Sequence, residues 1–217
     1  MLKFLITLTI FSLSLSADQK IPIAPLGFSV GSPTPKIYLE GFFNLIDPNS
    51  SKSFTNFWSA LQKLDIDHNP NLRFTFYVSP EPTYYFSFMT STGGRYISKN
   101  SQNPNDEFLY YQTIFENYET FSNAKTVDQS LNQVALTLAK LINSKMPQYK
   151  VDDIYNGLTT LSYLEEAADY GAFARSRGVV VAPTYFINEV QVDGASSFTT
   201  DRWVNYINQF LQMNAKL

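Results

Sequence analysis

Apolar positions along the chain predict three strands and a short hairpin partner. The run at 36–43 is rich in β-forming residues and begins directly after a proline, so we expect a buried strand there. A second run, at 73–79, alternates apolar and polar residues and ends at another proline. The third, at 184–188, is expected to form a hairpin with 190–192. These runs indicate a β-sheet built from segments far apart in the chain.

Apolar residues spaced three and four apart predict helices around these strands. The first helix is expected to begin near 50–53, a second runs from 131 to 142, and a last one covers 200–213. The apolar face of the first helix comprises Phe54, Phe57, Trp58, Leu61 and Leu64. That of the last comprises Trp203, Val204, Ile207, Phe210 and Leu211.

The middle of the chain has a weaker helical pattern. We expect a helix at 82–96, weakened by two adjacent glycines, and another at 106–121. A further helix is expected at 157–176. The candidate core positions of these last two helices are Leu109, Ile114 and Tyr118, followed by Leu161, Leu164, Ala168 and Ala172. The predicted order is strand, helix, strand, helical block, strand, hairpin and helix, which indicates an α/β fold with a helical insertion at about 82–160.

The first 17 residues have the three parts of a secretory signal peptide. Lys3 supplies the positive charge, 4–15 is an apolar run, and small residues follow at 14–17. The run is too short to cross the ~30 Å of a bilayer core. We therefore expect 18–217 to form a single domain in the lumen of the secretory pathway or outside the cell, with no stable membrane span.

The 217-residue chain contains no cysteine, although secreted domains are commonly stabilised by disulfides. This excludes thiol–disulfide chemistry, cysteine nucleophiles and cysteine-ligated zinc. The one histidine, His68, lies in a polar loop and is expected to be solvated. We expect no metal site and no cofactor. With 16 basic and 19 acidic residues, the chain is mildly acidic, which argues against nucleic-acid binding.

Aromatic residues make up 16% of the chain, with 14 tyrosines and 18 phenylalanines. Such a content is typical either of a core built from rings or of an aromatic binding face. Composition alone does not distinguish the two.

Two segments resemble the DsbA-like branch of the thioredoxin superfamily. One is 38–44 leading into Asp47-Pro48-Asn49-Ser50, and the other is 178–188. Members of that branch carry Cys-Pro-x-Cys or Cys-Pro-x-Ser after the first strand, so both redox cysteines are absent here. The resemblance implies a thioredoxin-like central mixed sheet flanked by helices, with a helical insertion.

The resemblance also implies a site. In the family the proline before the third strand is cis, and the residue before it offers backbone hydrogen bonds to an extended peptide. The corresponding candidates for peptide binding are Ala182, Pro183, Thr184 and Tyr185. The alternative is that this segment is a turn that serves only the fold and binds no ligand. We give this alternative and peptide binding equal weight.

The former redox positions, Asp47 to Ser50, have a structural interpretation of their own. Asp47, Asn49 or Ser50 would cap the following helix, which contributes about 1 kcal/mol. We favour capping over a catalytic base at Asp47, because no partner residue is visible in the sequence. Asn49-Ser50-Ser51 is also an N-glycosylation acceptor.

Three functions remain open. The first is a redox-inactive protein that binds extended polypeptide or a partner protein at the former active-site face. The second is a structural or assembly subunit whose aromatic surface is covered by partners. The third is an enzyme that uses carboxylates in place of thiols, and we favour a protein without enzymatic activity over it.

Overall fold

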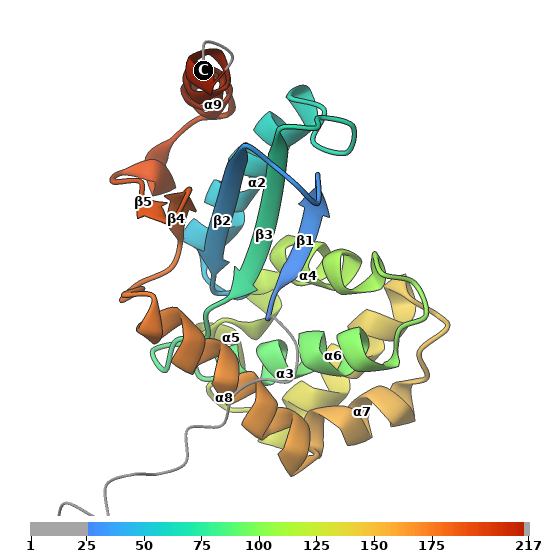
Figure 1. Cartoon of the computed structure of the whole chain (residues 1–217). Helices are drawn as coiled ribbons and strands as arrows, with labels where there is room; N and C mark the ends of the chain where they lie inside the picture. The colour runs from blue at the N-terminus through green and yellow to red at the C-terminus, as the bar shows by residue number, and fades with distance from the viewer. Residues whose placement is uncertain (1–25, 215–217) are drawn as a thin grey trace, which may run out of the picture.

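The computed structural model describes residues 26–214, and the expected signal peptide at 1–17 lies outside them (Figure 1). Its sheet has the strand order β1-β3-β2-β4-β5. β2 and β3 are parallel, and every other neighbouring pair is antiparallel. The strands are β1 (Phe28–Gly31), β2 (Ile37–Phe43), β3 (Leu72–Val78), β4 (Thr184–Ile187) and β5 (Val190–Gln191).

One helix follows β2, a block of helices separates β3 from β4, and a last helix ends the described chain. In Figure 1, α3, α6 and α7 gather below the sheet, while α9 lies at the top. The α-helices are α2 (Pro48–Lys63), α3 (Ser87–Asn100), α4 (Asp106–Glu116), α5 (Asn123–Thr126), α6 (Leu131–Lys145), α7 (Val151–Thr159), α8 (Leu161–Ser176) and α9 (Thr200–Asn214). The short 3₁₀ segments are η1 (Tyr118–Phe121) and η2 (Ala195–Ser197). The structure is the expected α/β fold, a mixed sheet with a helical insertion.

Most predicted elements are present, but one strand was missed and two helices were predicted with the wrong extent. β1 was missed, because it is a four-residue edge strand behind a turn-rich lead; its Phe28 pairs with Phe76. The single helix expected at 106–121 ends at Glu116 and continues as η1. The helix expected at 157–176 is two helices, which meet at Thr160.

The expected core face of α8 was also wrong. Leu161 is 69% exposed, and Leu164 also reaches solvent. The buried face instead comprises Ala167, Tyr170, Gly171 and Ala174. α8 packs along α3, and small side chains allow two helices to approach closely. On α4, Leu109 is likewise exposed, whereas Ile114 is fully buried.

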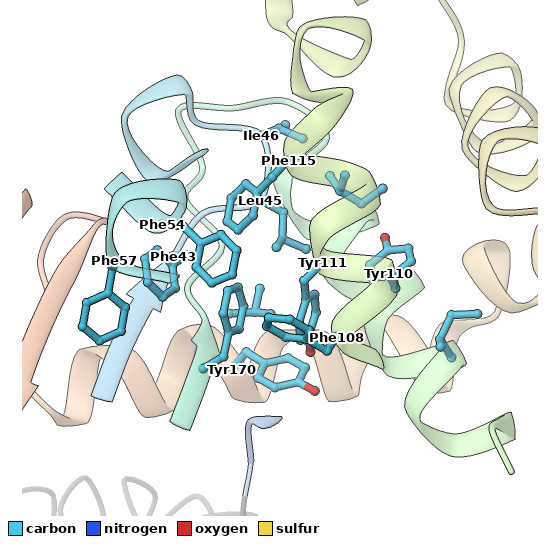
Figure 2. Close-up of a cluster of buried hydrophobic side chains, with 14 of the residues drawn as sticks. Phe43, Leu45, Ile46, Phe54, Phe57, Phe108, Tyr110, Tyr111, Phe115 and Tyr170 are labelled. Atoms are coloured by element: carbon cyan, nitrogen blue, oxygen red, sulfur yellow. The ribbon is translucent and has the colours of Figure 1, made fainter. Parts of the chain in front are cut away.

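Aromatic side chains form the core rather than a surface. Figure 2 shows rings from β2, α2, α4 and α8 packed against one another. Phe43 stacks on Phe76 with ring centroids 4.7 Å apart, and on the opposite face of the sheet Phe42 stacks on Tyr77 at 4.8 Å. Among the exposed large hydrophobic side chains of residues 26–214, only Tyr85 is aromatic. The high aromatic content is therefore explained by packing.

Within the same residues, no helix combines the length and apolar character that a bilayer crossing requires.

Candidate functional site

The sheet topology brings three separated segments to one edge. β2 and β3 are parallel, so the residues that follow Phe43 and Val78 leave the sheet side by side. β4 runs antiparallel to β2, so the segment that precedes Thr184 enters at the same edge. The start of α2, the loop after β3 and the Ala182-Pro183 segment therefore lie close together.

Asp47 is the N-cap of α2, in agreement with the capping role expected from the sequence. Its Oδ1 accepts the Asn49 N–H at 3.2 Å, and its Oδ2 accepts the Ser50 N–H at 2.8 Å. The Tyr84 hydroxyl donates to Oδ1 at 2.7 Å. The carboxylate thus accepts hydrogen bonds from two of the free N–H groups at the helix terminus. Its negative charge also interacts favourably with the positive end of the helix dipole.

The same bonds weigh against a catalytic base at Asp47. The side chain is 3% exposed, and both of its oxygens already accept hydrogen bonds. A general base must come within hydrogen-bond reach of the proton that it removes, and the burial of Asp47 opposes this. Asp47 therefore has the surroundings of a structural cap.

The remaining former redox positions differ in accessibility. Pro48 and Asn49 are exposed at the first turn of α2. Ser50 is fully buried, and its hydroxyl accepts the Asn44 N–H at 3.2 Å. Only two of the four positions can therefore face a ligand.

The Ala182–Pro183 peptide bond is cis, as the resemblance implied. The Ala182 N–H, however, is not free for a ligand: it donates to Oε1 of Glu81 at 2.6 Å. The hydroxyl of Thr184 also bonds within the segment, donating to the Val181 carbonyl at 2.6 Å. Part of the expected docking edge is thus occupied by the chain's own side chain.

Tyr185 does not belong to an accessible binding surface, which corrects the sequence-based expectation. Its side chain is 1% exposed, and its hydroxyl hydrogen-bonds with Ser53 Oγ at 2.7 Å. It points into the core because residues alternate between the two faces of a strand. Thr184 lies at the end of β4 and remains half-buried.

A cavity of about 470 Å³ lies between the start of α2, the Ala182-Pro183 segment and η2. Its lining is Asn49, Lys52, Asn56, Val181, Ala182, Pro183, Ser196 and Ser197. Next to it two apolar side chains project into solvent, since Val180 is 94% and Val181 61% exposed. The arrangement offers polar groups in the hollow and apolar groups at the rim.

Glu81 and Tyr84 are site residues that the sequence did not reveal. Burial raises the pKa of Glu81; the bond from Ala182 opposes this shift, and the nearby charge of Asp47 adds to it. Burial, with the bond to Asp47, also raises the pKa of Tyr84. The segment around Glu81 was interpreted only as the proline-rich end of a strand. The parallel pairing of β2 with β3 was the signal that would have placed it beside Asp47.

No metal centre was expected, and within residues 26–214 no three His, Asp or Glu side chains form a group that could hold a metal ion. His68 lies in an exposed turn, where its Nδ1 is 2.8 Å from Oδ1 of Asp65. It has the surroundings of a solvated loop residue.

No protein-family model and no curated protein matches the sequence. Solved structures do match the fold. α-DsbA1 of Wolbachia pipientis has a TM-score of 0.69 at 16% identity, with 90% of this chain and 96% of that chain covered. DsbA of Chlamydia trachomatis has a TM-score of 0.68 at 15% identity, with 91% and 98% covered. A putative protein-disulfide isomerase from Pseudomonas syringae has a TM-score of 0.66 at 19% identity, with 83% and 97% covered.

At such low identities the likeness establishes the fold alone. It agrees with the topology and with the cis bond before β4. The chain therefore has the thioredoxin-like fold of the DsbA-like proteins, and it has this fold without a single cysteine.

Proposed function

We propose that this chain is a redox-inactive, thioredoxin-like protein of the secretory pathway that binds an extended segment of polypeptide or of a partner protein. The binding face is the surface around the cavity between α2 and the Ala182-Pro183 segment. The observation that carries the proposal is the pairing of this cavity with the exposed Val180 and Val181.

The chemistry of this face suits a peptide rather than a small apolar ligand. The cavity has carboxamide, hydroxyl and ammonium groups that can pair with a peptide backbone. Val180 and Val181 offer apolar surface to alternate side chains of an extended segment. Because no thiol is present, binding cannot proceed to disulfide exchange and is reversible.

Glu81 competes with such a ligand. Its carboxylate takes the Ala182 N–H, the backbone donor next to the cavity. An extended ligand that pairs with this N–H must first displace Glu81, so Glu81 lowers the affinity of the face.

Photo-crosslinking tests the proposal. A benzophenone side chain is placed at Val180, and in a control variant at Val127, an exposed valine at the end of α5. The probe is reduced, carboxymethylated α-lactalbumin, an unfolded polypeptide. We expect crosslinks from position 180 and few from position 127. Equal yields from both positions, or none from position 180, would overturn the proposal.

The role of Glu81 is tested separately with Glu81→Ala and with Glu119→Ala, an exposed control. Loss of the Glu81 bond should speed hydrogen exchange of the Ala182 amide and raise the apparent affinity for the unfolded probe by about tenfold, the value of one hydrogen bond to a charged group. Faster exchange without tighter binding would contradict competition by Glu81.

A glycan at Asn49 is a further part of the proposal. Asn49 is exposed and lines the cavity, so an attached glycan would cover its α2 side. A mass decrease after glycosidase treatment of the secreted protein, absent in Asn49→Gln, is the expected result. If the site is fully occupied, peptide binding should increase when the glycan is removed.

The second candidate is an assembly subunit, favoured by the exposed Leu161 and Leu164 on one side of α8. It predicts that the native protein sediments as a larger complex and that Leu161→Ser releases the monomer. The third candidate, a carboxylate enzyme, has less support because Asp47 is buried and accepts three hydrogen bonds from the chain itself.

A further inference from the structure

A second cavity, of about 540 Å³, lies within the helical block, between the end of α3, the start of α4 and the connection from α6 to α7. Its volume falls in the range of ~300–1,000 Å³ that small-molecule sites occupy. None of its lining residues lines the cavity beside Ala182. Any ligand here would therefore be separate from the proposed peptide.

Asp106, at the start of α4, is the central polar group of this cavity. It is 5% exposed, and its Oδ2 accepts three hydrogen bonds: from the Tyr149 hydroxyl at 2.7 Å, from Ser101 Oγ at 3.0 Å and from Gln148 Nε2 at 3.2 Å. Oδ1 has no hydrogen-bond partner within residues 26–214, and Asp106 lines the cavity. The carboxylate is held firmly by one oxygen and leaves the other for a ligand.

The same bonds keep the group charged. Burial acts to raise the pKa of Asp106, but the bonds from Tyr149, Ser101 and Gln148 outweigh it and lower the pKa. At neutral pH the free oxygen is thus a strong hydrogen-bond acceptor.

Two tyrosines build a fixed aromatic part of the lining. The rings of Tyr96 and Tyr149 meet edge to face with centroids 6.5 Å apart. Tyr96 packs directly on the backbone of Gly157, where a Cβ atom would lie 2.2 Å from its Cδ2. The ring is therefore held in place before any ligand arrives.

The cavity lining carries both signs of charge, so a ligand of a single sign meets at least one like charge. An anion would meet Asp106 and Asp153, and a cation would meet the ammonium of Lys150. Carboxamides from 100–103 add neutral donors and acceptors. A ligand with many hydroxyl groups and no net charge can use all of these partners. We propose that this cavity binds a neutral carbohydrate, with one ligand hydroxyl donating to Oδ1 of Asp106.

Saturation-transfer NMR on the full chain tests this inference with methyl glycosides of glucose, galactose, mannose and N-acetylglucosamine as probes. Arginine amide and inorganic phosphate serve as cationic and anionic controls. We expect transfer to at least one glycoside and to neither ion. No transfer to any glycoside, or stronger binding of either ion, would overturn the inference.

Variants locate the binding. Asp106→Asn should weaken glycoside binding by about tenfold or more, because a hydrogen bond to a charged acceptor is lost. Asp153 is an exposed residue of the lining, and Asp153→Asn should weaken glycoside binding severalfold. This second variant tests the site even if Asp106→Asn does not fold. The control Asp152→Asn, on the same turn but outside the lining, should bind as the parent does. Unchanged binding in Asp153→Asn, or in a folded Asp106→Asn, would place the sugar elsewhere and refute the assignment.

Discussion

At the start of α2, an aspartate stands where the DsbA-like resemblance places a thiolate. Both groups are negative and both lie at the positive end of a helix. Asp47, however, uses its oxygens for Asn49, Ser50 and Tyr84, so the charge serves the fold. At this position the chain has a helix cap that also anchors the loop after β3 through Tyr84.

Asp47→Ala should therefore lower the free energy of unfolding by about 2 kcal/mol, since the helix loses its cap and Tyr84 loses its acceptor. Asp47→Asn should cost less, because the amide oxygen still accepts a hydrogen bond. Urea denaturation measures both. The control is Asp67→Ala, in an exposed turn. Equal stabilities of Asp47→Ala and Asp67→Ala would show that the cap contributes nothing.

Among the helices, α3 forms although two of its residues have a low intrinsic helix propensity. Its adjacent glycines, Gly93 and Gly94, weaken an isolated helix. In the fold they contact Tyr110 and Tyr111 of α4, and a Cβ atom on Gly93 would lie 2.3 Å from the Tyr110 hydroxyl oxygen. Tyr110 is fully buried and cannot move aside. The glycines are therefore required by the close approach of two helices.

Gly93→Ala should destabilise the fold by about 1–3 kcal/mol through overpacking, although alanine is the better helix former. Gly171→Ala is the matched test in α8. There the nearest atom to the new methyl group is the flexible Arg175 Nη1 at 3.2 Å, so stability should be unchanged or higher by up to about 1 kcal/mol. Thermal unfolding of both variants gives the comparison, and a stabilised Gly93→Ala would refute the packing argument.

At the scale of the whole molecule, an ion pair connects the helical block to the sheet. Arg177, just after α8, donates through Nη2 to Oε2 of Glu40 on β2 at 2.7 Å. Glu40 is 2% exposed, and its burial raises its pKa, against the opposing effect of Arg177. Arg177 is the main group that compensates the buried carboxylate, and a hydrogen bond from Tyr77 adds to its effect.

Arg177→Leu should cost about 3 kcal/mol at neutral pH, because it leaves a buried charge unpaired. A carboxyl group whose pKa is raised by folding destabilises the fold while it is ionised, so the loss should shrink as the pH falls and Glu40 is protonated. Urea denaturation across pH measures this. Adding Glu40→Gln should restore much of the loss. Arg175→Leu, at an exposed position, is the control, and a pH-independent loss would contradict the mechanism.

Local features of the chain were readable without a structure. Strands β2, β3 and β4 and helices α2, α6 and α9 follow from the spacing of apolar residues, which reports one buried face per element. The cap at Asp47 follows from residue type and position. The absence of thiol chemistry follows from composition alone.

Tertiary structure decided what depends on contacts between distant segments. The buried face of α8 is Ala167, Tyr170, Gly171 and Ala174 and not its leucines, because contacts with distant segments such as α3 decide which face is covered. Glu81 meets Ala182 only because β2 and β3 are parallel and β4 is antiparallel. Asp106 faces a cavity only because 101–106 and 148–149 come together. Periodicity reports which residues are buried in an element, whereas the partner of each buried or polar group is set by packing in three dimensions.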